Sequence, residues 1–248
     1  MFKKILIIFL LTSFLFLSSI PVSNDCKTVI LVGKLAKVQC DITNNDDYVS
    51  TKGTGTITFY DSTNKTFAAL GHGIKNENQL LEIKNGNIYF SEVSTITKSK
   101  NNKVGNLVSV PGSNSCLGNI TKNNDFGLYG KCNKNISGKE IEIANISELK
   151  IAPATLYLDF GNNSKKEFDI EITEIFDNTK NSNSNFKIKI TDSDLLEITG
   201  GIVKGMSGSP IIQNGKLVGA LTKVTNSDVS EGYCIFAETM LDECKNSK

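Results

Sequence analysis

The chain has 248 residues and a net charge of +1, so it lacks an electrostatic field that would attract nucleic acid. Its 27 basic residues are all lysine, which excludes recognition through a bidentate guanidinium, and no basic stripe with interleaved aromatic residues appears. The composition is that of an ordinary globular protein, and we expect no nucleic-acid partner.

The N-terminal segment carries a targeting signal. Lys3 and Lys4 precede an almost unbroken apolar run over residues 5–17, which is typical of a signal peptide. No clean small-x-small cleavage site follows, so we interpret residues 1–23 as a signal peptide or as an N-terminal membrane anchor. Either alternative predicts export, with residues 24–248 secreted or tethered to the outer face of the membrane.

Six cysteines follow this segment, and an even number in an exported chain favours disulfides. Pairing of sequence neighbours is the simplest prediction, with free buried thiols as the alternative. We expect no metal site, because the chain has one histidine and no C-x-x-C pair. The predicted pairs are Cys26 with Cys40, Cys116 with Cys132, and Cys234 with Cys244.

Short strands separated by turns dominate the chain from residue 54 onward. Apolar and polar residues alternate at 56–60, 168–172 and 186–190, which predicts half-buried strands. Many short strands argue for an all-β barrel or sandwich, and about 220 mature residues suit two small barrels packed together.

Turn signals support this pattern. The Asn-Gly pairs at 85–86 and 214–215 predict tight hairpin turns between apolar runs. A third hairpin is predicted to join 156–160 to 168–172. Helical periodicity is scarce, and the two short predicted helices lie at 193–197 and 237–244.

A glycine-rich loop at 200–210 surrounds Ser207 in the motif GMSGSP. Glycines let the backbone turn sharply, so that the N–H groups of Gly205 and Ser207 can converge on a carbonyl oxygen and form an oxyanion hole. The hairpin over 211–218 anchors the loop on a sheet. The alternative interpretation is a Gly/Ser turn without chemistry.

His72 is the only histidine, and glycines flank it at the end of an apolar run. Small neighbours expose an imidazole to a cleft, and its pKa near neutrality suits a base that must later return its proton. A lone histidine is more often incidental than catalytic. Combined with the Ser207 loop, it becomes the candidate general base.

A third group should orient the imidazole and stabilise its cation. Asp192 and Asp194 are the acids nearest in sequence upstream of Ser207. Either could instead be the N-cap of the short helix predicted at 193–197, because Asp is a preferred capping residue. Spacing alone does not choose between them.

These motifs resemble the sporulation peptidase IV B type of serine peptidase, family S55, a set of signalling proteases of spore-forming Firmicutes. The similarity extends from about residue 53 to residue 241, and is strongest in the His segment at 55–72 and in the Ser segment at 190–216. The family is grouped with trypsin-like peptidases. The resemblance therefore implies a trypsin-like double β-barrel.

Carried over position by position, the resemblance implies His72 as base, Asp192 as its acid and Ser207 as nucleophile. It also implies that the strand edge at Thr222 and Lys223 lines the substrate cleft, although the family tends to have His where this chain has Lys223. Relatives usually carry a PDZ domain before the peptidase domain, whereas too few residues for one precede residue 53 here.

The first hypothesis is therefore an exported serine endopeptidase that needs no cofactor. By resemblance its substrate is an exported or membrane protein, such as a regulator whose cleavage releases a sporulation signal. A non-catalytic binding module that keeps the barrel fold is the alternative from another class. A serine esterase is a third hypothesis, because the same triad would support it.

Overall fold

A computed structural model describes residues 27–44, 47–76, 79–101, 103–161, 166–176 and 182–246. The predicted signal or anchor segment, residues 1–23, and Cys26 lie outside these residues. Within the described ranges, no helix is both long and apolar enough to cross a membrane.

The N-terminal half forms an antiparallel sheet whose order is β2-β3-β8-β7-β6-β1-β9. Because β1 also pairs with β2, the sheet closes into a ring of six strands, with β9 added to the outside of β1. A small hairpin of β4 and β5 lies between β3 and β6 along the chain. The strands are β1 (Thr28–Asn44), β2 (Asp47–Asp61), β3 (Thr66–Ala69), β4 (Lys75–Asn76), β5 (Gln79–Leu80), β6 (Ile83–Thr97), β7 (Asn106–Asn124), β8 (Gly127–Cys132) and β9 (Glu140–Glu142).

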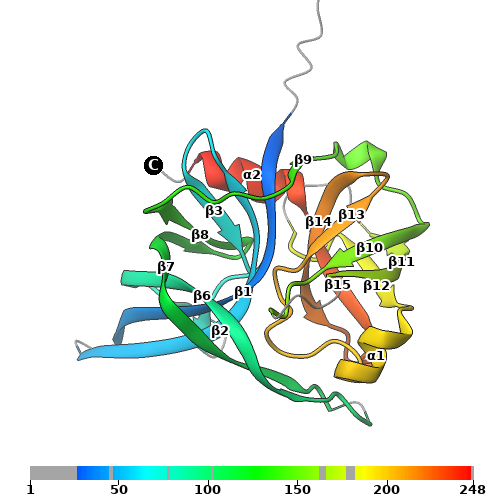
Figure 1. Cartoon of the computed structure of the whole chain (residues 1–248), viewed down its shortest axis with the longest axis horizontal. Coiled ribbons are helices and arrows are strands. Elements are labelled where there is room, and N and C mark those ends of the chain that lie inside the picture. The colour runs from blue at the N-terminus through cyan, green and yellow to red at the C-terminus, as the bar shows by residue number, and fades with distance from the viewer. Residues whose placement is uncertain are drawn as a thin grey trace, which may run out of the picture.

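The C-terminal half forms a second closed antiparallel barrel with the order β10-β11-β12-β15-β14-β13. In both rings the first three strands are followed by the sixth, fifth and fourth, so the two barrels share one topology (Figure 1). The elements are the 3-10 helix η1 (Ile146–Glu148), β10 (Pro153–Tyr157), β11 (Glu167–Ile175), β12 (Phe186–Ile190), α1 (Ser193–Thr199), β13 (Pro210–Gln213), β14 (Lys216–Val224), β15 (Glu231–Phe236) and α2 (Ala237–Lys245). The predicted all-β double barrel is confirmed.

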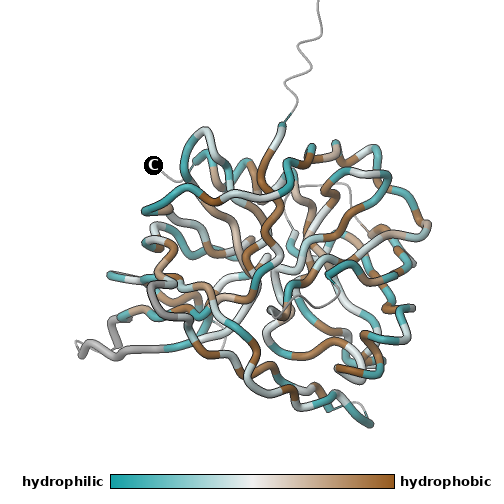
Figure 2. Tube along the Cα trace, viewed as in Figure 1, coloured by the Kyte–Doolittle hydropathy of each residue, from teal (hydrophilic) through white to brown (hydrophobic). Residues whose placement is uncertain are grey.

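Three apolar clusters hold the barrels together. One fills the second barrel, around Phe168, Ile188 and Phe236, and another fills the first barrel around Ile57 and Leu117. The third cluster joins side chains of both barrels to α2, so it fixes the barrels against each other. Figure 2 shows the apolar residues concentrated along the strands. Dense packing of this kind makes the junction between the barrels rigid.

Most of the predicted local structure is confirmed, with one exception among the turns. Asn214-Gly215 joins β13 to β14 with φ angles of 51° and 76°, as a tight hairpin turn requires. The hairpin of β10 and β11 pairs Leu156 with Phe168, and both short helices form. The prediction for Asn85-Gly86 is wrong, because this pair lies inside β6 opposite Asp41 and Cys40. Gly86 is needed there for packing, since a Cβ would lie 2.8 Å from the Ile120 side chain.

For two of the predicted disulfides the structure gives a correction, since Cys116, Cys132, Cys234 and Cys244 are free thiols. Cys234 lies in the core of the second barrel, whereas Cys244 lies on α2 in the cluster between the barrels. Cys116 and Cys132 lie on neighbouring strands but are not opposite each other, because Cys132 pairs with Gly118 and Cys116 with Tyr89. The predicted partner of Cys40 is Cys26, which the structure does not describe.

The alternation at 56–60 does not produce a solvent-facing side. Thr56 and Thr58 are both fully buried, because the loop that carries Ser207 covers this face of β2. The Thr58 hydroxyl donates to the Gly208 carbonyl at 2.7 Å. Residues 56–60 are therefore buried on both faces of the strand.

Thr58→Val should test this inter-barrel contact, because the change keeps the shape of the side chain but leaves the Gly208 carbonyl buried without its donor. We expect the free energy of unfolding to fall by about 1–3 kcal/mol, measured by urea denaturation. The exposed Thr95 of β6 provides the control, and Thr95→Val should change stability by less than about 0.5 kcal/mol. Equal effects of the two substitutions would contradict the structural role of Thr58.

Candidate active site

Two adjoining cavities lie at the junction of the barrels, and His72 and Ser207 line both of them. The larger, of about 320 Å³, extends along the second barrel past Leu221. The smaller, of about 260 Å³, extends along the first barrel past Leu70 and Ile74. The two predicted catalytic residues therefore lie where the two cavities meet. A bound peptide could extend from this point into both cavities.

The loop after β3 places His72 at this junction through unusual backbone conformations. Leu70 and Gly71 both have positive φ angles, 70° and 67°, so the chain reverses sharply before the histidine. A Cβ at Gly71 would lie 3.0 Å from Thr222 of the second barrel. The glycine before His72 therefore lets this loop approach the opposite barrel closely.

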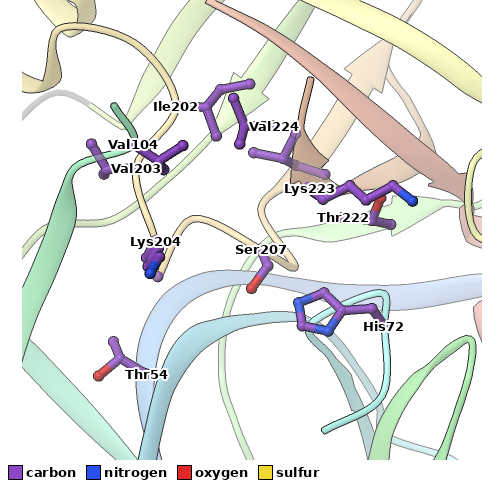
Figure 3. Close-up of a pocket in the computed structure, with 12 residues that line it drawn as sticks. Thr54, His72, Val104, Ile202, Val203, Lys204, Ser207, Thr222, Lys223 and Val224 are labelled. Carbon is purple, nitrogen blue, oxygen red and sulfur yellow. The ribbon is translucent and has the colours of Figure 1, made fainter. Parts of the chain in front are cut away.

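The imidazole of His72 is oriented by a backbone carbonyl. Its Nδ1 lies 3.0 Å from the carbonyl oxygen of Gly73, which can only accept, so Nδ1 carries the proton. The other nitrogen, Nε2, is on the side of Ser207, as Figure 3 shows. Among the described residues, the side chains of His72 and Ser207 do not hydrogen-bond each other. Such catalytic contacts commonly tighten when substrate binds.

Burial is the main cause that lowers the pKa of His72 below its ordinary value. The contact with Gly73 opposes this shift in part, whereas the positive charges of Lys223 and Lys75 lower the pKa further. The imidazole is therefore neutral at neutral pH. In this state Nε2 has a free lone pair and can accept a proton.

The Ser207 loop is attached to the first barrel by hydrogen bonds from β2. The backbone N–H of Thr56 donates to the Ser207 carbonyl at 2.8 Å, and its hydroxyl donates to the Gly205 carbonyl at 3.0 Å. On the other side, the Gly208 N–H donates to the Leu221 carbonyl at 2.7 Å. Hydrogen bonds to both barrels thus hold the Ser207 loop in place.

The predicted oxyanion donors remain available. Gly205 has a φ of 104°, a conformation that favours glycine. Among the hydrogen bonds of the described residues, none is donated by the N–H of Gly205 or of Ser207. Both donors can therefore receive a negatively charged oxygen beside the Ser207 hydroxyl.

Asp192 makes the contacts of the alternative role that the sequence left open for it. This residue is the N-cap of α1, where its carboxylate accepts from the N–H of Leu195 at 2.9 Å and from that of Asp169 at 3.2 Å. Asp192 lines neither cavity that contains His72, and the Nδ1 of His72 faces Gly73 instead. Asp194, the other candidate, is exposed in the first turn of the same helix.

A clamp on the His72 loop was not predicted from the sequence. Asn123, near the end of β7, accepts from the Ile74 N–H and donates to the carbonyls of Ile74 and Leu81. Next to it, Asp125 pairs with Lys75 at 2.7 Å. These contacts hold the segment after His72 to the β7–β8 turn. The hydrogen bonds of Thr56 and Thr58 to the Ser207 loop were also not predicted, although the alternating pattern of this strand offered a signal for them. An Asn in a turn offers no such signal.

Thr222 and Lys223 both line the larger cavity, as the prediction of a substrate edge requires. The Thr222 hydroxyl is committed to the Tyr233 carbonyl, and the Lys223 ammonium lies 5.4 Å from the centre of the Tyr233 ring. Pairing of β14 with β13 ends at Ala220. Leu221 is hydrogen-bonded to Gly208 and Ser209 of the Ser207 loop, and beyond it the strand has β15 on one side and the cavity on the other.

Comparison with known families gives a match over most of the chain. Residues 46–241 match the model of the family described as SpoIVB peptidase S55. No curated protein matches the chain.

Solved structures of serine proteases are similar to the chain. The active form of the Rv3671c protease from M. tuberculosis is 12% identical, with a TM-score of 0.42, and the alignment covers 85% of this chain and 78% of that chain. The thermostable serine protease AL20 from an extremophilic microorganism is 11% identical, with a TM-score of 0.46, covering 87% and 97%. The protease Anisep from Arthrobacter nicotinovorans is 12% identical, also with a TM-score of 0.46, covering 89% and 98%.

Asp192→Asn separates a helix cap from a catalytic acid, because Asn caps a helix as well as Asp does but cannot stabilise an imidazolium. We expect near wild-type peptide cleavage for this variant, with a small loss of stability because the amide nitrogen cannot accept from the Asp169 N–H. Asp192→Ala should lower the free energy of unfolding by about 1 kcal/mol through loss of the cap. A loss of kcat on the order of 10⁴-fold in a stably folded Asp192→Asn variant would restore Asp192 as the acid.

Proposed function

Because the chain belongs to the SpoIVB peptidase S55 family, whose members are serine-type peptidases, we propose that it is an endopeptidase in which Ser207 is the nucleophile and His72 the general base. One observation carries the proposal. The only histidine and the serine of the glycine-rich loop come from different barrels, yet they line the same two cavities.

The chemistry is acyl transfer. As the Ser207 hydroxyl oxygen attacks the scissile carbonyl carbon, its proton passes to Nε2 of His72. The imidazolium then gives this proton to the leaving amine, and the peptide bond breaks to leave an ester on Ser207. Water, deprotonated by the same nitrogen, hydrolyses the ester and regenerates the hydroxyl.

Within this mechanism the Gly73 carbonyl performs the orienting function of a triad acid. It holds the proton on Nδ1 and so keeps Nε2 available to Ser207. A neutral carbonyl stabilises the imidazolium less than a carboxylate would, and Lys223 and Lys75 oppose it. The oxyanion donors Gly205 and Ser207 therefore supply a larger share of the transition-state stabilisation.

The open edge of β14 supports a peptide substrate. An extended segment can pair with the backbone beyond Leu221 as an added strand, which places its carbonyl groups beside Ser207. Thr222 and Lys223 would then contact the substrate mainly through the backbone. This mode of binding requires an exposed, unfolded stretch of the target protein.

Export defines the class of target in this proposal. The signal-like segment at residues 1–23 indicates an exported enzyme, secreted or tethered to the outer face of the membrane. Its substrate would be an exposed segment of another exported or membrane protein. The family resemblance supports a role in sporulation signalling.

A binding module without proteolysis is the second candidate, and a specific observation favours it. No carboxylate contacts the imidazole of His72 among the residues that the structure describes, and the His72 and Ser207 side chains are not hydrogen-bonded. Such a module would bind an extended segment along β14 without cutting it.

Ser207→Ala and His72→Ala decide between the two candidates. Each should abolish cleavage of an unfolded protein substrate, and each should abolish labelling by a serine-directed fluorophosphonate, because nucleophile and base act as a unit. Lys131→Gln, on the exposed side of β8, is the control and should retain both activities. A folded wild-type protein that neither labels nor cleaves would favour the binding module.

Lys223→Gln should shift the pH profile of cleavage. The positive charge of Lys223 lowers the pKa of His72, so its removal raises that pKa and moves the acid limb of kcat/KM to higher pH. In the wild-type enzyme the acid limb should lie below about pH 6.5. Lys75→Gln should shift the limb in the same direction, and Lys131→Gln should leave it in place. A shift toward lower pH in the first two variants would refute the assignment of this limb to His72.

A further inference from the structure

The larger cavity beside Ser207 has the character of a side-chain pocket, and we propose that it selects an aliphatic residue on the amino-terminal side of the cleaved bond. This inference rests on the proposed function, because it identifies the substrate class of the same site. The residue bound there would be the one whose carbonyl carbon is attacked by Ser207.

The walls of this cavity are aliphatic. Ile202 and Val203 approach from the segment before Ser207, Val104 from the first barrel, and Leu221 and Val224 from β14 (Figure 3). Among the described residues, no Phe or Tyr ring and no acidic side chain lines the cavity. An apolar side chain that enters it exchanges water for hydrocarbon contacts on several sides.

The pocket is also rigid. Ile202, Val203 and Leu221 belong to the core cluster of the second barrel and are 3%, 2% and 0% exposed. The Ile202 N–H donates to the Val229 carbonyl at 2.6 Å, and the hydroxyl of the buried Ser99 donates to the Ile202 carbonyl at 2.7 Å. A preformed pocket of about 320 Å³ binds a side chain without a cost of reorganisation.

Charge disfavours the other substrate classes. The charged groups at the cavity are Lys204 and Lys223, on opposite sides in Figure 3. A basic substrate residue would meet two like charges and no carboxylate. An acidic residue would have to bury its carboxylate among Ile202, Val203 and Leu221, while the Lys223 ammonium is directed over the Tyr233 ring.

The open edge of β14 aligns the substrate with this pocket. The strand runs along the cavity wall from Leu221 to Val224. In a paired strand, alternate side chains point to the same side. A peptide added along this edge therefore directs one side chain into the aliphatic cavity while its backbone reaches Ser207.

The smaller cavity would receive the segment beyond the cleaved bond. It lies across His72 and Ser207 from the aliphatic pocket and is lined by Val38, Gly53 and Lys75, among others. Its lining combines Lys52 and Lys75 with the aliphatic Val38, Leu70 and Ile74. The proposed selection concerns the larger cavity alone.

Matched peptides that differ only at the residue before the cleaved bond test this inference. With Leu, Gly, Glu or Lys at that position, kcat/KM should be highest for Leu, by about tenfold or more over each of the others. Equal or faster cleavage after Glu or Lys would overturn the proposal.

Substitutions in the pocket wall should redirect the preference. Val224→Asp, at a half-buried position on the wall, should raise the rate after Lys relative to Leu, whereas Val224→Asn should weaken the Leu preference without favouring Lys. If Val224→Asp fails to fold, Val104→Asp places the charge on the opposite wall from another half-buried position. An unchanged preference in a folded aspartate variant would also overturn the pocket assignment.

Fluorophosphonate labelling of Ser207 separates the two levels of the proposal, because the probe has no peptide side chain to fill the pocket. Labelling together with a preference for Glu or Lys would overturn the pocket inference and leave the peptidase mechanism intact. Absence of labelling in the folded wild-type protein would overturn the proposed mechanism, and the inference with it.

Discussion

The geometry of the site depends on one buried residue of the first barrel, Thr56. Its N–H and hydroxyl bind the Ser207 loop at two carbonyls, and its own carbonyl accepts from the N–H of Leu70 at the start of the His72 loop. A single residue is therefore hydrogen-bonded to both the Ser207 and the His72 segments. The apolar cluster between the barrels makes this possible, because it brings β2 against the second barrel and excludes water from these hydrogen bonds. The positions of the Ser207 loop and of the His72 loop on either side of the cleft depend on this contact between β2 and the second barrel.

Electrostatics give the site an unusual balance. In the familiar serine triad a carboxylate stabilises the imidazolium. Here the imidazole is half-buried, its Nδ1 faces the Gly73 carbonyl, and the neighbouring charges that act on its pKa are positive. The neutral base is favoured over its protonated form. Such a site gains a reactive base at mildly acidic pH but relies on backbone donors for the developing oxyanion.

Local patterns in the sequence were sufficient for most strands, and they singled out the two residues, His72 and Ser207, that line both cavities of the site. The glycines around these residues reflect backbone conformations that are set locally. The role of Asp192 could not be decided that way. A capping Asp and a triad acid have the same local signature, and the difference lies in which distant element the carboxylate meets. The turn prediction for Asn85-Gly86 was wrong for a related reason, because the missing side chain of Gly86 leaves room for Ile120 and Cys40. The inter-barrel bonds of Thr56 and Thr58 likewise depend on a partner about 150 residues away.

The shared topology of the barrels has a consequence for biosynthesis. The base belongs to a ring whose last strand ends at Cys132, whereas the nucleophile belongs to a ring that closes only with β15, at Phe236. During synthesis the first ring can close long before the second, since domains form as units from the N-terminal side. The emerging chain therefore remains without hydrolytic power until almost its whole length has been made. Because the base and the nucleophile belong to different rings, the chain cannot cleave itself before the second ring has closed.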